Sequence, residues 1–214
     1  MGWVAKERLK SPRARLFVAL DLPASVRDGL VDWQRAALAD PVLRAMKPEA
    51  LHVTLCFLGY RPERSIDEIA GILAEIEARP VELALGAEPV PIPGGRPRLY
   101  AIGATGAAAG ELQAELAEAL SAVRLYEPEK RPFWPHLTVA RVRSERRPPG
   151  PGERRGKGRP RRVSKSPARL PRKLTSPFGA VRMALYRSNL KPEGAEYVSL
   201  AGVDLPSPQG DQKR

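Results

Sequence analysis

The pattern apolar, His, apolar, Thr, apolar occurs twice in this chain, each time within a strand-like run of apolar residues. The first copy contains His52 and Thr54, the second contains His136 and Thr138, and the chain has no other histidine. Because side chains of a strand alternate between its two faces, each histidine shares a face with its threonine, about 7 Å away along the chain. Their apolar neighbours face the opposite layer. The sequence therefore predicts two rigid strands that each present one imidazole and one hydroxyl.

Apolar residues elsewhere recur with the periods of strands and helices. Further strands are expected at 15–22, 81–90, 98–104, 181–186 and 196–200, beside those at 51–58 and 136–142. Three helices are indicated by apolar residues at helical spacing: Val26, Leu30, Trp33 and Ala37; Ile66, Ile69, Leu73 and Ile76; Leu112, Leu116, Leu120 and Val123. Hairpin-like strand pairs between the helices favour the α+β class with largely antiparallel sheets. The repeated motif suits a bilobal, internally duplicated fold whose two sheets face a central cleft, with the helices packed outside.

The net charge of +12 is concentrated in one segment of the chain. Residues 143–173 contain 13 Lys or Arg against two Glu, together with six Pro and four Gly. A segment of this composition does not bury enough apolar surface to offset the entropy of ordering, so we expect a disordered basic insertion. The folded domain is expected at 15–205, between a flexible N-terminus at 1–14 and a disordered tail at 206–214.

Cysteine content and apolar run length indicate where the protein resides and whether it holds a metal. Cys56 is the only cysteine and cannot form an internal disulfide, which fits a reducing cytoplasm. One cysteine and two histidines are too few ligands for a zinc site, so no metal is expected. The continuous apolar run at 16–20 is too short for a signal sequence or a membrane span. We therefore expect a soluble, cytoplasmic monomer without membrane contact.

Two imidazoles that face one pocket can act together as an acid and a base. Imidazole titrates near pH 6.5, so one histidine can accept a proton while the other donates one. In-line displacement at phosphorus uses both: one group deprotonates the attacking water, and the other protonates the departing alkoxide. The threonine hydroxyls can bind the non-bridging oxygens, and Arg141 can neutralise their charge. Structural histidines, a metal site and nucleophilic catalysis by Cys56 are the alternatives, and the recurrence of the motif favours the acid–base pair.

Four segments of the chain resemble successive sequence blocks of one enzyme family. They are RLFVALDLP, LHVTLCFLG, RPFWPHLTVAR, and LYRSNL followed by GAEY, and they span Arg15 to about Leu205 in order. In this order they are similar to the 2H phosphoesterases, specifically the RNA 2′,3′-cyclic phosphodiesterases, also called 2′-5′ RNA ligases. The resemblance implies a bilobal, metal-free fold whose cleft is lined by both H-x-T motifs.

The resemblance also implies roles for individual residues. His52 would protonate the leaving 3′ oxygen and His136 would activate water, so that the cyclic phosphate opens to a 2′-phosphate. Thr54, Thr138 and Arg141 would bind the phosphate oxygens. On a straight strand, however, Arg141 faces away from His136, so it reaches the phosphate only if the strand bends or ends before it.

Aromatic residues near the motifs have two interpretations. Phe133 and Trp134 precede the second motif and are candidates for stacking on a nucleobase, with core packing as the alternative. Phe17 and Phe57 share the spacing of the core-facing residues in their strands, so they are expected to be structural.

The expected reaction is metal-independent hydrolysis of RNA 2′,3′-cyclic phosphate ends, without a cofactor. The same histidines would serve the reverse reaction, which joins a cyclic phosphate to a 5′-hydroxyl through a 2′-5′ bond. A different hypothesis is a non-catalytic nucleotide- or RNA-binding module that uses the cleft and the basic segment. In an enzyme, segment 143–173 would either contact the backbone phosphates of a long RNA or form a solvated loop with no specific role.

Overall fold

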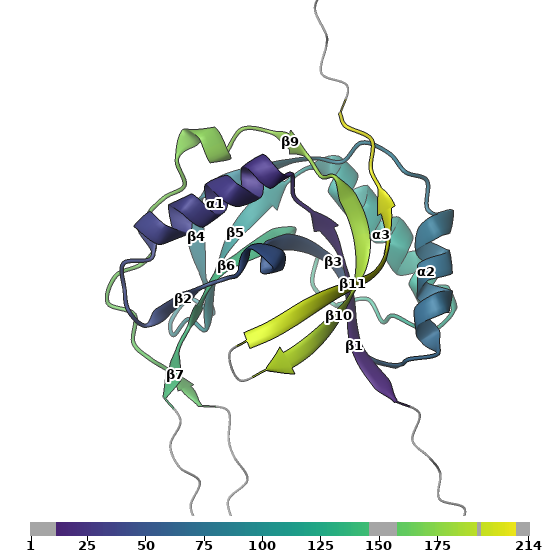
Figure 1. Ribbon diagram of the computed structural model, residues 1–214, viewed down its shortest axis with the longest axis horizontal. Helices are drawn as coiled ribbons and strands as arrows, with labels where there is room; N and C mark the ends of the chain where they lie inside the picture. Colours follow the sequence, from purple (N-terminus) through teal and green to yellow (C-terminus); the bar gives the residue numbers. More distant parts are fainter. Residues whose placement is uncertain (1–11, 146–157, 192–193, 209–214) are drawn as a thin grey trace, which may run out of the picture.

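The computed structural model describes residues 12–145, 158–191 and 194–208, and this part of the chain belongs to the α+β class (Figure 1). Its strands are β1 (Arg13–Asp21), β2 (Leu43–Ala45), β3 (His52–Pro62), β4 (Glu82–Ile92), β5 (Leu99–Thr105), β6 (His136–Val142), β7 (Ser144–Glu145), β8 (Arg159–Pro160), β9 (Phe178–Gly179), β10 (Arg182–Lys191) and β11 (Gly194–Asp204). Its helices are α1 (Ala24–Ala37), α2 (Ser65–Glu75) and α3 (Ala107–Ala122), with the short 3-10 helices η1 (Pro48–Ala50) and η2 (Arg172–Leu174). The predicted α+β class with largely antiparallel sheets is confirmed.

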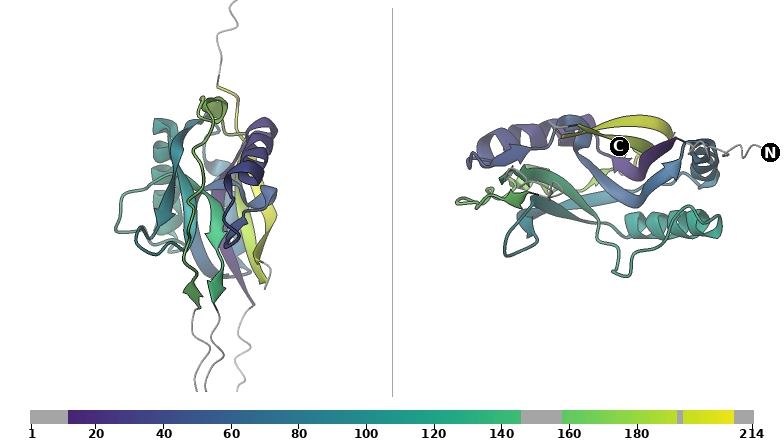
Figure 2. Two further views of the ribbon diagram at one scale, coloured as in Figure 1. Left: turned by 90° about the vertical axis from the view of Figure 1, so that its left-hand side faces the viewer. Right: turned by 90° about the horizontal axis from the view of Figure 1, so that it is seen from below.

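Two antiparallel sheets form the framework of the fold. One has the strand order β11-β10-β1-β3, and the other has the order β2-β6-β5-β4-β9. A separate ribbon consists of β7 and β8. β3 is an edge strand of the first sheet and contacts β6 of the second, so the two motif strands are neighbours. Figure 2 shows the two sheets as adjacent layers.

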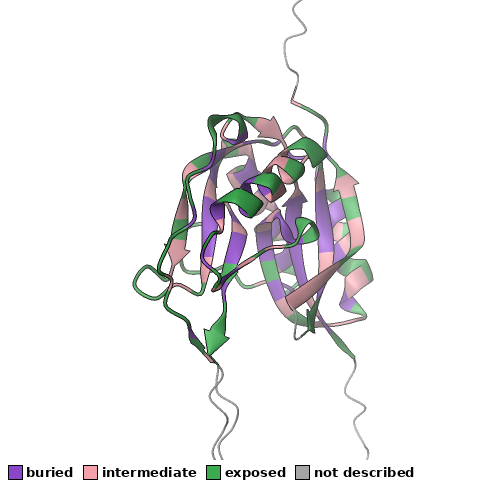
Figure 3. Ribbon diagram, turned by 60° about the vertical axis from the view of Figure 1, so that its left-hand side comes forward, coloured by how far each residue is buried: buried purple, intermediate pink, exposed green. Residues whose placement is uncertain are grey.

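Each α-helix buries one apolar stripe, and Figure 3 shows the exposed outer side of α1 in green. The buried stripe residues are Leu30, Trp33 and Ala37 in α1, Ile69 and Leu73 in α2, and Leu112, Leu116 and Leu120 in α3. Burying each leucine contributes roughly 1.5–3 kcal/mol. Val123, expected to extend the third stripe, lies past the end of α3 and is 42% exposed. Within the described ranges, no helix is both long and apolar enough to cross a membrane.

The folded domain begins slightly earlier than expected. β1 starts at Arg13, which pairs with Pro62 of β3, and Ala14 is buried. Residues 13–14 therefore belong to the first sheet and not to a flexible N-terminus. At the other end of the domain Pro208 lies against Gly179. The remainder of the two expected termini, residues 1–11 and 209–214, lies outside the described residues.

The expectation that 143–173 is disordered throughout is wrong for residues 158–173. The Asp40 carboxylate accepts hydrogen bonds from the Ser164 N–H (2.7 Å), the Ser164 hydroxyl (2.7 Å) and the Lys165 N–H (3.0 Å). A hydrogen bond that the Val42 N–H donates to Asp40, together with these three contacts, holds the pKa of Asp40 well below its usual range.

A buried leucine and a further hydrogen bond attach the same part of the segment to the domain. Leu170 is buried, and the Trp33 indole donates to the Arg169 carbonyl at 3.1 Å. These attachments cannot be predicted from the composition of the segment, because the acceptor Asp40 and the apolar surface belong to distant parts of the chain. Residues 146–157, the centre of the basic segment, lie outside the described residues.

Replacing Asp40 with alanine should release 158–173 from the domain, because three donors lose one acceptor together. Limited digestion with trypsin, read by mass spectrometry, should show faster cleavage after Lys165 and Arg169 in the variant. Asp32→Ala is the matched control, since Asp32 is an exposed carboxylate whose partner is Arg35, and it should leave both rates unchanged. Equal cleavage rates after Lys165 in wild type and D40A would contradict the anchoring role.

Candidate active site

A β-bulge decides which side chains of β3 face the pocket. Leu55 is an extra residue between the pairs that β1 makes with Thr54 and Cys56. A bulge of this kind reverses the alternation of side chains beyond it. Leu55 and Cys56 are both buried as a result, and Phe57 lies on the same face as His52.

β6 carries a bulge at the same place relative to its own motif. Val139 is an extra residue between the pairs that β5 makes with Thr138 and Ala140. Arg141 consequently lies on the face of His136 and lines the same pocket. On a straight strand Arg141 would face away from His136, and the bulge at Val139 between them brings it to the same face.

Gln34 of α1 supports the bulge in β6. Its Nε2 donates to the Val139 carbonyl at 2.7 Å and to the Met46 carbonyl at 3.2 Å. The Met46 N–H also donates to the Val139 carbonyl, at 3.0 Å. A bulge leaves backbone groups outside the ladder, and these need partners when they are buried. The amide of Gln34, which is 3% exposed, supplies such a partner.

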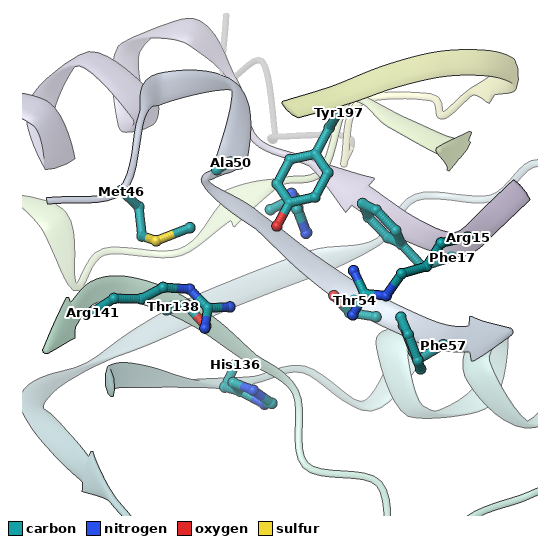
Figure 4. Close-up of a pocket in the computed structure, with 11 residues that line it drawn as sticks. Arg15, Phe17, Met46, Ala50, Thr54, Phe57, His136, Thr138, Arg141 and Tyr197 are labelled. Carbon is teal, nitrogen blue, oxygen red and sulfur yellow. The ribbon is translucent and has the colours of Figure 1, made fainter. Parts of the chain in front are cut away.

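A pocket of about 150 Å³ lies where the two sheets meet (Figure 4). It is lined by Arg15, Phe17, Met46, Ala50, His52, Thr54, Phe57, His136, Thr138, Arg141 and Tyr197. The first His-Thr pair comes from β3, and the second pair comes from β6 together with Arg141. In Figure 4, Arg141 and Arg15 reach toward the pocket from opposite sides. The structure therefore brings all five polar residues of the two motifs to one pocket.

Aromatic rings surround His52. Phe17 stacks on its imidazole with ring centroids 4.9 Å apart, and Tyr197 meets it edge-on at 5.3 Å. Tyr186 stacks on Phe17 at 5.3 Å, and its hydroxyl donates to Asp21 at 2.6 Å. This hydrogen bond fixes the ring of Tyr186, so the imidazole is held between rigid neighbours.

Burial lowers the pKa of His52 from 6.5 to about 4. The backbone of Glu49 opposes this shift, and the nearby positive charge of a protonated His136 adds to it. The imidazole of His52 is therefore neutral at pH 7 before a substrate binds. An anion in the pocket would raise its pKa, because a nearby negative charge favours the imidazolium.

His136 is oriented by the residue two positions before it. Its Nδ1 lies 2.8 Å from the Trp134 carbonyl oxygen, and the indole of Trp134 stacks on the imidazole with centroids 4.4 Å apart. A carbonyl oxygen only accepts, so Nδ1 carries the hydrogen. In the neutral ring, Nε2 then has the free lone pair and can act as a base.

Six lining residues of the pocket were not predicted as site residues: Arg15, Phe17, Met46, Ala50, Phe57 and Tyr197. The expectation that Phe57 faces the core is wrong, whereas Phe17 is buried as expected; both rings also line the pocket. Phe57 is 45% exposed, since the bulge at Leu55 turns it from the core face to the pocket face. Phe17 is buried and forms the wall behind His52.

The two aromatic residues proposed for base stacking are not among the lining residues of the pocket. Phe133 packs against the hydrophobic core. Trp134 is 42% exposed and covers the ring of His136. Base stacking by either residue remains a prediction.

Cys56 is a buried core residue. Burial raises the pKa of its thiol to about 12, so it is not a nucleophile at neutral pH. Among the described residues, no three His, Cys, Asp or Glu side chains gather where a metal ion would be held.

The titration of His52 can be measured directly, because the chain has only two histidines. In ¹⁵N NMR spectra of the imidazoles, His52 should stay neutral from pH 8 to pH 5 and titrate near pH 4. His136→Gln assigns the signals. A midpoint of 6 or above for His52 in the substrate-free protein would show that its burial is not maintained in solution.

The same shift predicts a change in stability. The pKa of His52 is lower in the folded than in the unfolded protein, so between pH 6.5 and 4 the unfolded chain binds more protons. The free energy of unfolding should fall over this window by up to about 3 kcal/mol more in wild type than in H52Q. Urea titrations at pH 7 and pH 4 measure it, and equal losses in both proteins would refute the linkage.

Comparisons with known proteins identify the family of this chain. The family model described as the 2′-5′ RNA ligase superfamily matches residues 23–149. A protein of Thermus thermophilus named RNA 2′,3′-cyclic phosphodiesterase is 33% identical over 210 residues, which cover 93% of this chain and 94% of the relative. A protein of Archaeoglobus fulgidus with the same name is 32% identical over 139 residues, covering 60% and 73%.

Solved structures show the same fold. The crystal structure of TT0787 of Thermus thermophilus superposes with a TM-score of 0.70 at 27% identity, covering 89% of this chain and 97% of that one. The structure of Escherichia coli LigT complexed with 3′-AMP gives 0.67 at 20% identity, covering 91% and 99%, and at that identity shows the fold alone. The family predicted from the paired motifs is confirmed: this chain belongs to the 2′-5′ RNA ligase superfamily of enzymes.

Proposed function

We propose that the pocket hydrolyses 2′,3′-cyclic phosphate ends of RNA to 2′-phosphates, with His52 as the acid and His136 as the base. The observation that carries the proposal is the meeting of two His-Thr pairs and Arg141 at one pocket. The names of the relatives from Thermus thermophilus and Archaeoglobus fulgidus support the class of substrate.

The proposed reaction is an in-line displacement at phosphorus. Nε2 of His136 takes a proton from water as the water oxygen bonds to phosphorus on the side opposite the 3′ oxygen. The bond between phosphorus and the 3′ oxygen breaks, and the imidazolium of His52 protonates that oxygen. Thr54, Thr138 and Arg141 hydrogen-bond the non-bridging oxygens, whose charge grows in the transition state.

Substrate binding supplies the protonated form of His52 in this proposal. The pKa of His52 is about 4 before the substrate binds, and the phosphate anion brought next to the imidazole raises it. The buried ring thus charges only beside a partner, which limits the cost of placing a cation away from water.

We also infer that the fold is an internal duplication with a cleft between its halves. The order strand, helix, motif strand occurs as β5, α3, β6 and, with the short β2 and η1 inserted after the helix, as β1, α1, β3. In each half the bulge directly follows the threonine of the motif. The bilobal arrangement accounts for the position of the pocket between two sheets.

A longer RNA would also contact residues outside the pocket. Trp134, with 42% of its surface exposed beside the pocket histidine, is a candidate platform for a base. The exposed cations of 158–173, which include Arg159 and Arg162, would add sequence-independent contacts to RNA phosphates. The reverse 2′-5′ joining reaction uses the same two histidines.

The competing proposal is a binding module without turnover. Binding alone requires donors for the phosphate and does not require two imidazoles on opposite sides of it. A cyclic-phosphate dinucleotide separates the two: hydrolysis to the 2′-phosphate supports the enzyme, and binding without hydrolysis supports the module.

His52→Ala and His136→Ala should each lower turnover of that dinucleotide by on the order of 10²-fold or more, as expected for loss of a general acid or base. Circular dichroism and binding of inorganic phosphate control for the fold. EDTA should leave wild-type turnover unchanged. Near-wild-type rates in both variants, or loss of activity in EDTA that a divalent metal restores, would overturn the proposed mechanism.

The pH dependence should be bell-shaped, because one imidazole must be neutral and the other protonated. Since the substrate anion raises the pKa of His52, the limb that belongs to this residue should lie at higher pH in kcat than in kcat/KM. Steady-state kinetics from pH 4 to pH 9 measure both limbs. If neither limb lies at higher pH in kcat than in kcat/KM, the substrate does not raise the pKa of His52 and does not supply its protonated form.

A further inference from the structure

Arg15 is a pocket residue with a charge that nothing described in the structure neutralises. Its Nη1 donates to the Ser188 hydroxyl at 2.7 Å, and its guanidinium carbon lies 4.6 Å from the ring centroid of Phe57. No ion pair of the described residues includes Arg15 or Arg141. The residues that line the pocket include these two arginines and no carboxylate.

Two guanidinium groups exceed what one cyclic phosphate requires. A 2′,3′-cyclic phosphate carries a single negative charge, and Arg141 lies on the strand of the proposed base. Arg15 approaches from the opposite side of the pocket (Figure 4). Its contacts to Ser188 and Phe57 fix its direction, which lowers the entropy lost when it binds an anion.

The proposed chemistry indicates which part of a substrate lies near Arg15. Water attacks from the side of His136, so the departing 3′ oxygen and its ribose lie on the side of His52. Arg15 of β1 and His52 of β3 both line the pocket and belong to the same sheet, whereas His136 belongs to the other sheet. The next negative charge on that side of an RNA chain is the phosphodiester that joins the last ribose to the preceding nucleotide.

We infer that Arg15 binds the phosphodiester preceding the terminal nucleotide, so that the site selects ends of RNA chains over cyclic mononucleotides. Phe57 acts as a positioning residue, because its ring holds the guanidinium by a cation–π contact. This inference rests on the proposed function and specifies the substrate class of the same pocket.

Three substrates with the same terminal nucleoside test the inference. They are adenosine 2′,3′-cyclic phosphate, the dinucleotide with one preceding phosphodiester, and the same dinucleotide with an uncharged methylphosphonate at that linkage. Wild type should have a kcat/KM about tenfold or more higher for the charged dinucleotide than for the other two, as expected for one hydrogen-bonded charge pair.

Arg15→Gln should remove this preference and leave kcat/KM for the mononucleotide within about threefold of wild type, which also shows that the variant folds. Arg15→Lys should keep part of the preference. Phe57→Leu should weaken it and Phe57→Tyr should retain it. Arg13→Gln is the matched control, because Arg13 lies on the same strand, does not line the pocket and donates to the Tyr60 carbonyl; it should match wild type on all three substrates.

Two results would overturn the inference alone. One is a wild-type enzyme that turns over the three substrates equally well. The other is a loss in R15Q that is equal for all three, which would place Arg15 on the cyclic phosphate itself. If wild type hydrolyses none of the three, the proposed function fails and this inference fails with it.

Discussion

The pocket depends on one backbone device, a β-bulge placed directly after the threonine of each motif strand. In a regular strand, the residue five positions after a histidine faces away from it. The extra residues Leu55 and Val139 reverse this parity. They bring Phe57 and Arg141 into a pocket that would otherwise be lined only by imidazoles and hydroxyls from these strands. The carbonyl freed at Val139 is bound by the amide of Gln34, so a buried side chain of α1 contributes to the placement of the arginine.

The surroundings of the His52 imidazole have two opposing effects. The aromatic rings of Phe17, Tyr186 and Tyr197 give it a fixed orientation, and the same burial disfavours its charge. Rigid placement and a high fraction of imidazolium are therefore competing demands at this position. His136 meets the first demand differently, through a backbone carbonyl and one stacked indole. Two residues in matching sequence contexts thus have different electrostatic environments.

Sequence reasoning predicted the α+β class, most of the buried stripe of each helix and the five polar residues that meet in the pocket. These features depend on local periodicity or on a repeated motif, which a single sequence displays. The positions of Phe57 and Arg15 were missed because they depend on a bulge and on a neighbouring strand. The ordering of residues 158–173 was missed for a related reason: the carboxylate that binds them belongs to Asp40, and the composition of a charged segment does not reveal a distant acceptor.

The fifth residue after each motif histidine is Phe57 in one strand and Arg141 in the other. A pocket with arginine at both places would present more similar groups to a phosphate from either side, and two orientations of a bound ligand would differ less in energy. Phenylalanine at one of the two places separates these energies, because only one wall then offers a guanidinium from its motif strand. In the proposed reaction this asymmetry would favour one orientation of the scissile group, with its entering and departing oxygens at different walls.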